Sequence, residues 1–336
     1  MKKIRNIQKT SFLKKIFIKF CRIFRYEIID QANFRSPTLN KSLNETLSVP
    51  GEKSITIPLG LINITRKIRT FKIILRTCTS ELIMDQNKRR LFDCEKNEYT
   101  FRALKSLIRA TSLAKNIFNN IKFEFIVTDT NSAENDVVKI KELLNQTDID
   151  SKFLSIDIKD FENKIKPGYS KAKFSNMANF YTSLLMAQNE DSDIIYFVED
   201  DYIHSSNSIV EMIFSYEKFS TIFKTDPVLL PSDYPYLYTK DEPTKIYLGE
   251  KHHWRLVSES LVTFMTSGNL VKENFINLES MGIEWIDPWE KPLHEIYKKN
   301  PCLSPLPSLA YHCANINSVF GVSPNIDLKK LWDENK

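Results

Sequence analysis

The stretch Asp193-Ile-Ile-Tyr-Phe-Val-Glu-Asp-Asp-Tyr-Ile-His204 decides the fold class of this chain. Its apolar run, 194–198, has the length and composition of a strand that is buried on both faces, as strands in parallel α/β sheets are. Three carboxylates follow at once, Glu199, Asp200 and Asp201. Ligands of such sheets collect at the carboxyl ends of the strands. The stretch therefore predicts a largely parallel α/β sheet with an acidic ligand site at its carboxyl edge.

The three acids are typical of a metal-phosphate site, because adjacent carboxylates repel one another unless a cation is present. Alternate side chains of an extended chain point the same way, so Glu199 and Asp201 are expected to reach one ion while Asp200 faces elsewhere. Mn²⁺ or Mg²⁺ fits these oxygen ligands, and a substrate diphosphate would complete the shell. Asp201 is the first choice of ligand and Glu199 the second. The alternative is a solvated turn with its acids in water.

Glycine and cysteine usage excludes several classes of protein. Only 7 of the 336 residues are glycine, and neither Gly-x-Gly-x-x-Gly nor Gly-Lys-Ser/Thr occurs, so the dinucleotide fingerprint and the P-loop are absent. A nucleotide bound here would need a metal to hold its phosphates. The 5 cysteines are scattered and form no Cys-x-x-Cys pair, which argues against a zinc or disulfide framework and for a reducing compartment.

The amino terminus is strongly basic, and the rest of the chain is mildly acidic. Residues 1–25 carry nine Lys or Arg and no acid, against a net charge of +5 for the whole chain. Apolar residues fall there at helical spacing, namely Leu13, Ile16, Phe17, Phe20 and Phe24. Such a helix either lies on an anionic membrane surface or packs on its own domain or another subunit. Neither a signal peptide nor a nucleic-acid-binding arm is indicated. We expect a cytoplasmic protein, peripheral at the inner face of the membrane if the helix binds lipid.

The pattern of the chain predicts where the α/β body lies. Residues 26–70 read as a loose lead-in, because prolines and glycines interrupt every regular pattern. The predicted strands are 71–77, 123–127, 153–158 and 194–198, and the predicted helices are 101–118, 137–144 and 174–188. Their alternation implies right-handed crossovers and a mostly parallel sheet flanked by helices. The expected domains are 1–70, a basic helix and lead-in, and 71–336, the α/β domain.

Three segments resemble, in order, those of GT-A-type nucleotide-sugar glycosyltransferases, closest to the bacterial family 2 group. Lys72-Ile-Ile-Leu-Arg-Thr-Cys78 resembles the family's opening strand, whose end approaches the nucleotide. Phe125-Ile-Val-Thr-Asp-Thr-Asn-Ser132 resembles its second strand, which ends in an Asp that meets the base. Lys171-Ala-Lys-Phe-Ser-Asn-Met-Ala-Asn179, with the acid-tipped strand after it, is similar to the basic, Asn-bearing helix and the Asp-x-Asp strand.

The resemblance implies a GT-A fold, which is Rossmann-like, with 71–204 as the nucleotide-sugar-binding half and 205–336 as the acceptor-binding half. A UDP-sugar is the first expectation for the donor. The implied donor-binding residues are Arg76, Thr77, Asp129, Lys173, Asn179 and Asp200. Several enzymes of this type return a histidine to the metal near the chain's end, so His312 is a candidate third ligand.

The second half supplies further candidates for donor, acceptor and base. Arg255 is a candidate for bidentate pairing with a diphosphate. Tyr234 and Tyr236 lie in a segment rich in aromatic residues and proline, 231–238, which either stacks on sugar faces or forms a plain surface loop. Trp285 and Trp289 are the other acceptor-binding candidates.

Two carboxylates, Asp287 and Glu290, stand among those tryptophans. Apolar surroundings disfavour the ionised form of an acid and raise its pKa toward the range useful for a general base. In inverting glycosyltransferases a carboxylate in this later region deprotonates the acceptor, so Glu290 is the first choice of base and Asp287 the second. The alternative is a helix start with Asp287 as N-cap and Pro288 in its first position, and both roles are compatible.

Taken together, the residues and the resemblance predict a metal-dependent, inverting glycosyltransferase of polysaccharide biosynthesis. It would transfer a sugar to a hydroxyl of a glycan, a lipid-linked acceptor or a surface polysaccharide. Two alternatives come from other classes. The same acids could serve a nucleotidyltransferase or a phosphohydrolase with two metals, or the chain could be a non-catalytic domain that binds glycans or assembles a complex.

Overall fold

The computed structural model describes residues 12–24, 26, 48–56, 60–81, 90–189, 192–239, 241–314 and 326–336. The chain divides into two units, Met1–Leu47 and Ser48–Lys336. The smaller unit contains helix α1, Phe12–Ile23. No helix among these ranges combines the length and the hydropathy of a membrane-spanning segment. The larger unit contains the sheet and the candidate site.

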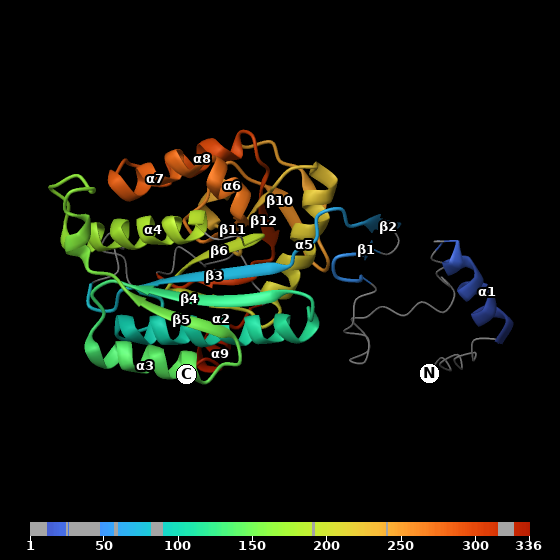
Figure 1. Cartoon of the computed structure of the whole chain (residues 1–336), viewed down its shortest axis with the longest axis horizontal. Helices are drawn as coiled ribbons and strands as arrows, with labels where there is room; N and C mark the ends of the chain where they lie inside the picture. The colour runs from blue at the N-terminus through green and yellow to red at the C-terminus, as the bar shows by residue number, and fades with distance from the viewer. Residues whose placement is uncertain are drawn as a thin grey trace. The chain divides into compact units, whose positions relative to one another are not determined.

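Strand β3, Thr70–Thr77, anchors the parallel half of the sheet (Figure 1). Its run Ile73-Ile-Leu75 is fully buried, as suits a strand that is covered on both faces. It pairs in parallel with β4, Lys122–Asp129, on one side and with β6, Ile194–Glu199, on the other. Strand β5, Asp150–Ser155, adds a fourth parallel strand beside β4. The predicted parallel α/β arrangement of this half is confirmed.

The later part of the chain extends the same sheet with shorter strands in mixed directions. The full order is β5-β4-β3-β6-β11-β8-β12-β10-β9. Strand β11 is antiparallel to β6 and joins the two halves. The added strands are β8, Val228–Leu229, β9, Ile246–Leu248, β10, His253–Leu256, β11, Phe264–Ser267, and β12, Cys302–Leu306.

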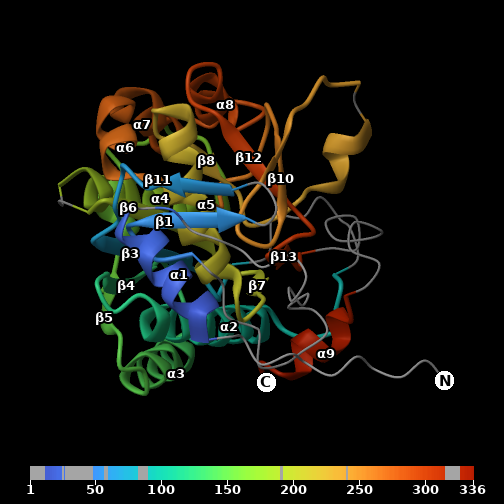
Figure 2. The same cartoon turned by 90° about the vertical axis from the view of Figure 1, so that its right-hand side faces the viewer.

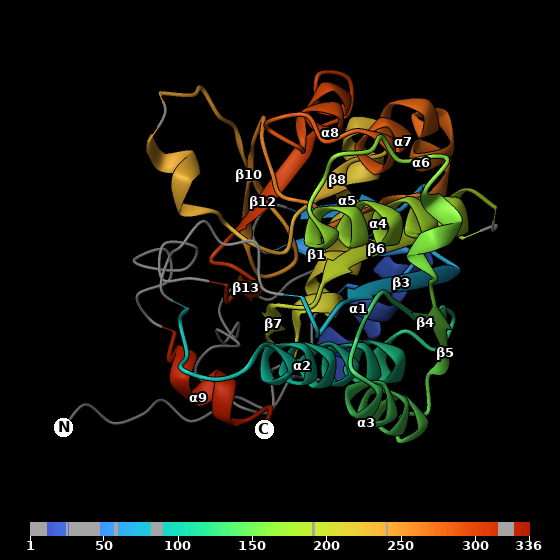
Figure 3. The ribbon, with the colours of Figure 1, turned by 90° about the vertical axis from the view of Figure 1, so that its left-hand side faces the viewer.

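Helices cover both faces of the sheet, because its strands are apolar on both sides. Ile73 and Leu75 pack in one core cluster with α2, Lys96–Ile117, α3, Glu134–Asn145, and α5, Ser208–Phe223. Ile74 points the other way, into a cluster with α4, Lys171–Asn189, and the helices α6, Gly268–Glu273, α7, Phe275–Ile283, and α8, Lys291–Tyr297. Figure 3 shows α4 on one side of β3 and β4, with α2 and α3 on the other.

Two small elements complete the larger unit. A two-stranded sheet pairs β7, Tyr202–His204, with β13, Ala310–His312 (Figure 2). It brings the segment just after the acidic run beside a segment more than a hundred residues later. Helix α9, Leu328–Asp333, packs Trp332 against Phe92 and Tyr99.

The prediction that residues 26–70 hold no regular element is wrong for its second part. Strands β1, Lys53–Thr56, and β2, Gly60–Asn63, form an antiparallel pair. Gly51 and Gly60 adopt positive φ, so the glycines that read as breakers permit turns instead. The amide of Gly51 donates to Oε2 of Glu217 at 3.0 Å, which fixes this pair to α5. The larger unit therefore begins at Ser48 rather than at Phe71.

Element boundaries shift where the apolar pattern is weak. Strand β5 begins at Asp150 rather than at residue 153, because it lies at the edge of the sheet and has no need of a continuous apolar run. Helix α2 begins at Lys96 rather than at residue 101, and its added turn contributes the buried Tyr99.

The contact between α4 and α7 gives a stability prediction. A Cβ at Gly282 would lie 2.8 Å from Cβ of Tyr181 and 3.2 Å from its Cα, closer than atoms pack. We expect Gly282→Ala to lower the free energy of unfolding by about 1–3 kcal/mol, because the two helices must move apart. Urea unfolding checks this, with Ile276→Ala on the exposed side of α7 as the control that changes by less than about 0.5 kcal/mol. Equal stability of the Gly282 variant would contradict the close packing.

Candidate active site

A cleft of about 510 Å³ lies at the carboxyl ends of β3 and β6. Parallel pairing brings these two strand ends together, since Arg76 stands opposite Glu199 in the register. Residues from both halves of the unit line the cleft. The predicted site residues among them are Arg76, Thr77, Asn179, Glu199, Asp200, Asp201, Trp285, Asp287, Trp289, Glu290 and His312. Their common location is set by the topology, since they come from segments far apart in sequence.

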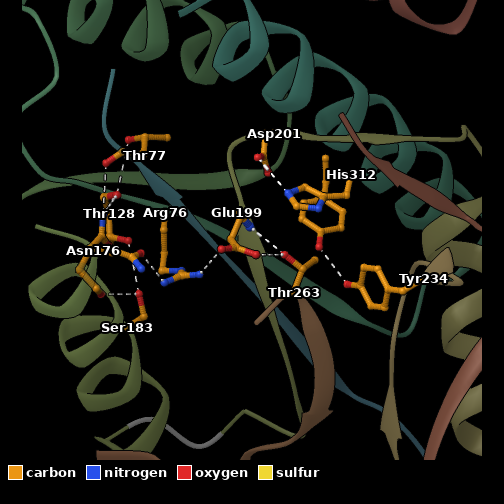
Figure 4. Close-up of polar contacts among 12 residues, drawn as sticks. Arg76, Thr77, Thr128, Asn176, Ser183, Glu199, Asp201, Tyr234, Thr263 and His312 are labelled. Carbon is orange, nitrogen blue, oxygen red and sulfur yellow. Dashed lines mark hydrogen bonds and ion pairs between the residues drawn. The ribbon is translucent and has the colours of Figure 1, made fainter. Parts of the chain in front are cut away.

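Arg76 holds Glu199 at the centre of this cleft (Figure 4). The Arg76 Nη2 lies 3.2 Å from Oε1 of Glu199, and its Nη1 donates to Oδ1 of Asn176 at 3.1 Å. The other carboxylate oxygen of Glu199 accepts from the hydroxyl of Thr263 at 3.1 Å. Burial raises the pKa of Glu199, and the neighbouring guanidinium opposes that rise. A protein cation thus stands beside Glu199, where the sequence alone suggested a metal.

The second acid, Asp200, faces away from this pair. Its Oδ2 accepts from the hydroxyl of Thr100 at 2.8 Å and from the amide of Cys78 at 3.4 Å. Burial raises the pKa of Asp200, and the positive charge of Lys96 opposes the rise. Lys96 also lines the cleft and donates to the carbonyl of Cys78. Sequence reasoning missed Lys96, because its turn of α2 lies ahead of the predicted helix.

The third acid, Asp201, meets His312. The pairing of β7 with β13 places His312 opposite Tyr202, and its Nε2 lies 3.1 Å from Oδ2 of Asp201. The amide of Cys313 donates to the carbonyl of Asp201 at 2.8 Å and closes this small ladder. Burial by itself would raise the pKa of Asp201, but the charge and hydrogen bond of His312 together with the charge of Lys96 oppose this rise, and the pKa is lowered. The two residues come together only through the tertiary fold.

A stack of aromatic rings fixes the orientation of His312. Its ring lies parallel to that of Tyr202, with centroids 4.7 Å apart and 10° between the planes. The hydroxyl of Tyr202 is 2.9 Å from that of Tyr234. Tyr234 is 1% exposed, so it supports Tyr202 from the core and offers no open face to a sugar. Tyr236 stacks on Tyr234 and is 37% exposed, outside the residues that line the cleft.

The donors at Asp201 and His312 fit a divalent cation that also binds substrate. Oδ1 of Asp201 is buried and has no hydrogen-bond partner among the described residues. Within those residues no group of three His, Cys, Asp or Glu is arranged as a complete metal cage. One or two carboxylates are nevertheless the usual protein ligands of Mg²⁺ in sites where substrate phosphates complete the shell. The carboxylate and imidazole pair therefore suits a cation shared with a diphosphate.

The segment before α8 makes another part of the cleft lining. Trp285 and Trp289 stack with centroids 4.9 Å apart and 2° between their planes, and the indole nitrogen of Trp289 donates to the carbonyl of Met281 at 2.8 Å. Lys173 does not line the cleft and lies with its Nζ 4.5 Å from the ring centroid of Trp285. The two tryptophans thus form a rigid apolar wall.

Glu290 lies beside this wall and is the N-cap residue of α8, although its side chain makes no capping hydrogen bond. The interpretation of Asp287 as N-cap with Pro288 in the first position is wrong, since the helix begins at Lys291 and has Pro292 at its start. Proline is tolerated there because its missing amide is not needed in the first turn. Burial in this wall raises the pKa of Glu290 to about 7, and the charges of Glu199 and Asp287 add to the rise. A carboxyl group with this pKa can exchange protons near neutral pH.

Two more predicted donor-binding residues, besides Lys173, lie outside the cleft lining. Arg255 is held by Asp233, with Nη2 and Nε at 2.8 and 3.1 Å from the same carboxylate oxygen. Asp129 is 3% exposed and accepts from the hydroxyl of Thr77 at 2.7 Å. Burial raises the pKa of Asp129, and its hydrogen bonds oppose the rise.

Asn179 is different, because it both lines the cleft and ties two strands together. Its side-chain nitrogen donates to the carbonyls of Thr77 and Thr128, at 3.2 and 2.9 Å. Its Oδ1 is buried and has no hydrogen-bond partner among the described residues. Asn179 therefore fixes the carboxyl ends of β3 and β4 on which the cleft is built.

Fold and site define this protein as an α/β protein with an acidic cleft at the carboxyl edge of a parallel half-sheet, where a buried arginine and an Asp-His pair meet. No protein-family model matches the chain. No curated protein matches it either.

Solved structures of glycosyltransferases and of a nucleotidyltransferase are similar in general architecture. An active-site mutant of LgtC shows 12% identity and a TM-score of 0.36, with 68% of this chain and 65% of that one covered. TarS from S. aureus shows 15% identity and a TM-score of 0.38, with 70% of this chain and 35% of that one covered. A UTP-bound UGPase from Acinetobacter baumannii shows 8% identity and a TM-score of 0.42, with 80% of this chain and 93% of that one covered. The chain spans less than two thirds of the first two. Its function is therefore inferred from its own site.

Proposed function

We propose that the protein is a metal-dependent glycosyltransferase that moves a sugar from a nucleoside-diphosphate sugar to an acceptor hydroxyl. One observation carries the proposal. The Asp201–His312 pair and the carboxyl group of Glu290, whose pKa is near neutral, line the same cleft. Such a cleft has a place for the leaving diphosphate and a place for the attacking hydroxyl.

Asp201 and His312 would hold Mn²⁺ or Mg²⁺ on the donor side. When bound, the cation neutralises charge on the leaving diphosphate, which lowers the barrier to its departure. Lys96 lines the same side of the cleft and adds a fixed positive charge. Arg76 is already paired with Glu199, so we assign it to holding that acid and shaping the cleft floor. The donor base is left open, with uridine as the first expectation.

Glu290 would act on the acceptor side. In the proposed step the acceptor oxygen forms a bond to the anomeric carbon while the bond from that carbon to the diphosphate oxygen breaks. The proton of the acceptor hydroxyl passes to the carboxylate of Glu290, and the nucleoside diphosphate leaves with the bonding electrons. Displacement from the opposite face inverts the anomeric centre. Trp289 is 5% exposed and supports Trp285 from the core. The half-buried ring of Trp285 suits the apolar part of a sugar ring, so the acceptor is proposed to be a glycan or a lipid-linked glycan.

Product analysis tests this proposal. We expect the purified chain to release a nucleoside diphosphate from one of the UDP-, GDP-, CDP- or TDP-sugars in the presence of Mn²⁺, with simple glycosides or water as acceptor. EDTA should abolish the release, because without the cation no charge neutralises the leaving diphosphate. Release of pyrophosphate from a nucleoside triphosphate and a sugar phosphate would instead identify a nucleotidyltransferase and contradict the proposal.

A further inference from the structure

Helix α1, Phe12–Ile23, presents a row of large apolar side chains to solvent. Phe12, Leu13 and Ile23 are each at least 75% exposed. The exposed apolar residues of this segment are Phe12, Leu13, Ile16, Phe17, Phe20, Ile23 and Phe24. Soluble proteins seldom leave so many aromatic and aliphatic side chains together on one short helix without a partner that covers them.

These residues share one face of the helix. At about 100° per residue, the exposed apolar residues from Phe12 to Ile23 fall within an arc of roughly 140°, and the apolar Ile18 falls outside it. Lys19 and Arg22 fall outside that arc. The charge is also one-sided in the sequence, because residues 1–25 contain nine basic residues and no acid. The helix is therefore amphipathic, with an apolar face and a cationic remainder.

This combination distinguishes between possible partners. A second copy of the helix would complement the apolar face but would bring another cluster of positive charge to it. The surface of an anionic bilayer complements both features at once, since acyl chains accept the apolar face and phosphate headgroups attract the basic residues. The helix has 12 residues and spans about 18 Å, too short for a hydrocarbon core of about 30 Å. It would therefore lie in the plane of the surface.

We propose that α1 anchors the protein to the surface of a membrane rich in anionic lipid. Lys19 and Arg22 contact the headgroups, and Phe17 and Phe20 enter the upper acyl region. This anchor stands apart from the chemistry of the cleft, so it holds or fails independently of the proposed sugar transfer. If both hold, the acceptor is presented at a membrane, as a lipid-linked glycan would be.

Vesicle sedimentation of the full chain tests the anchor. We expect binding to phosphatidylcholine vesicles that contain phosphatidylglycerol to be at least 10-fold tighter than binding to phosphatidylcholine alone, and to weaken as salt is raised. Phe17→Glu/Phe20→Glu should lower the binding at least 10-fold by removing the apolar contact. Lys19→Glu/Arg22→Glu should remove the preference for anionic lipid. Ile276→Glu, which changes an exposed apolar residue on α7, is the matched control and should bind like the wild type.

Three results would overturn the proposal. Equal binding to both kinds of vesicle would leave no role for the charge. A change from dimer to monomer in Phe17→Glu/Phe20→Glu, without any effect on lipid binding, would identify a second copy as the partner. A lower melting temperature of the larger unit in that variant, again with lipid binding unchanged, would show that α1 packs on its own chain.

Discussion

Replacement of Asp201 by asparagine is expected to abolish metal-dependent nucleotide binding while the protein remains folded. Asparagine keeps the volume of the side chain but removes the charge that pairs with His312 at 3.1 Å. Because loss of a mere supporting residue of a metal site costs 10–100-fold, loss of the carboxylate ligand itself should weaken binding by about 100-fold or more. Calorimetric titration with UDP, GDP, CDP and TDP, each with and without Mn²⁺, measures the effect and names the base.

The comparison with two other acids makes this result specific. Asp148→Asn changes an exposed acid far along the chain from the cleft segments and should bind nucleotide like the wild type. Glu199→Gln should weaken binding less than Asp201→Asn, because Glu199 faces Arg76 and Thr263 rather than His312. If Glu199→Gln abolished the metal response and Asp201→Asn did not, the metal site would have to be reassigned to Glu199.

Replacement of Glu290 by glutamine is expected to lower kcat by roughly 10²–10⁴-fold, the usual contribution of a general base. Donor binding should stay unchanged, because Glu290 is not among the residues proposed to hold the cation or the diphosphate. The wild-type rate should rise with pH through about 7, since burial raises the pKa of this carboxyl to about 7 and only its ionised form accepts a proton. In the glutamine variant that rise should be absent. Measurement of kcat/KM from pH 5 to 9 checks both points.

The carboxyl group of Glu290 also affects the free energy of unfolding, and the direction of that pH dependence can be measured. Glu290 binds its proton more tightly in the folded chain than in the unfolded one, so its contribution to stability is greatest at low pH. That contribution is lost as the pH rises from the ordinary carboxyl range through about 7. Glu273→Gln is the matched control, because Glu273 is exposed and does not line the cleft. A pH profile that stayed unchanged in Glu290→Gln, or a product of retained configuration by NMR, would remove Glu290 from the role of base.

The parallel half of the sheet followed from the sequence because its signals are local. The run 194–198 is apolar at every position, and only a strand covered on both faces requires that. The run ends in acids, and the carboxyl edge of a parallel sheet is where ligands collect. Predicted helices 137–144 and 174–188 likewise lie within α3 and α4, since each has an apolar stripe at helical spacing.

Sequence patterns whose conformation depends on contacts with distant residues led to wrong predictions. Prolines and glycines before residue 71 indicated a loose segment, yet β1 and β2 pair there. The amide of Gly51 donates a hydrogen bond to Glu217 on α5, which holds this segment against the helix. Pro288 indicated a helix start, but the helix begins three residues later. In each case the same residue type fits two conformations, and a contact far along the chain selects one of them.

The predicted alternation of the three acids shows the same limit at the site. Glu199, Asp200 and Asp201 do have separate environments, but strand β6 ends at Glu199, so the extended geometry behind the prediction no longer applies. Their directions are set by Arg76, Thr100 and His312. Each of these partners lies a hundred residues or more from its acid in the chain. Arg255, by contrast, pairs with Asp233 and does not line the cleft.

The sequence by itself determined the α/β class, the acid-tipped strand and the amphipathic basic helix, because each depends on the order of side chains within one element. Only the tertiary structure decided that Asp201 meets His312, that Arg76 holds Glu199, and that Glu290 lies beside the two tryptophans in the same cleft. These relations depend on which strands are neighbours and in what register. The free energy that pairs two strands is spread over their whole length. The side chain that a site residue contacts is therefore set by the packed fold and not by the neighbours of that residue in the sequence.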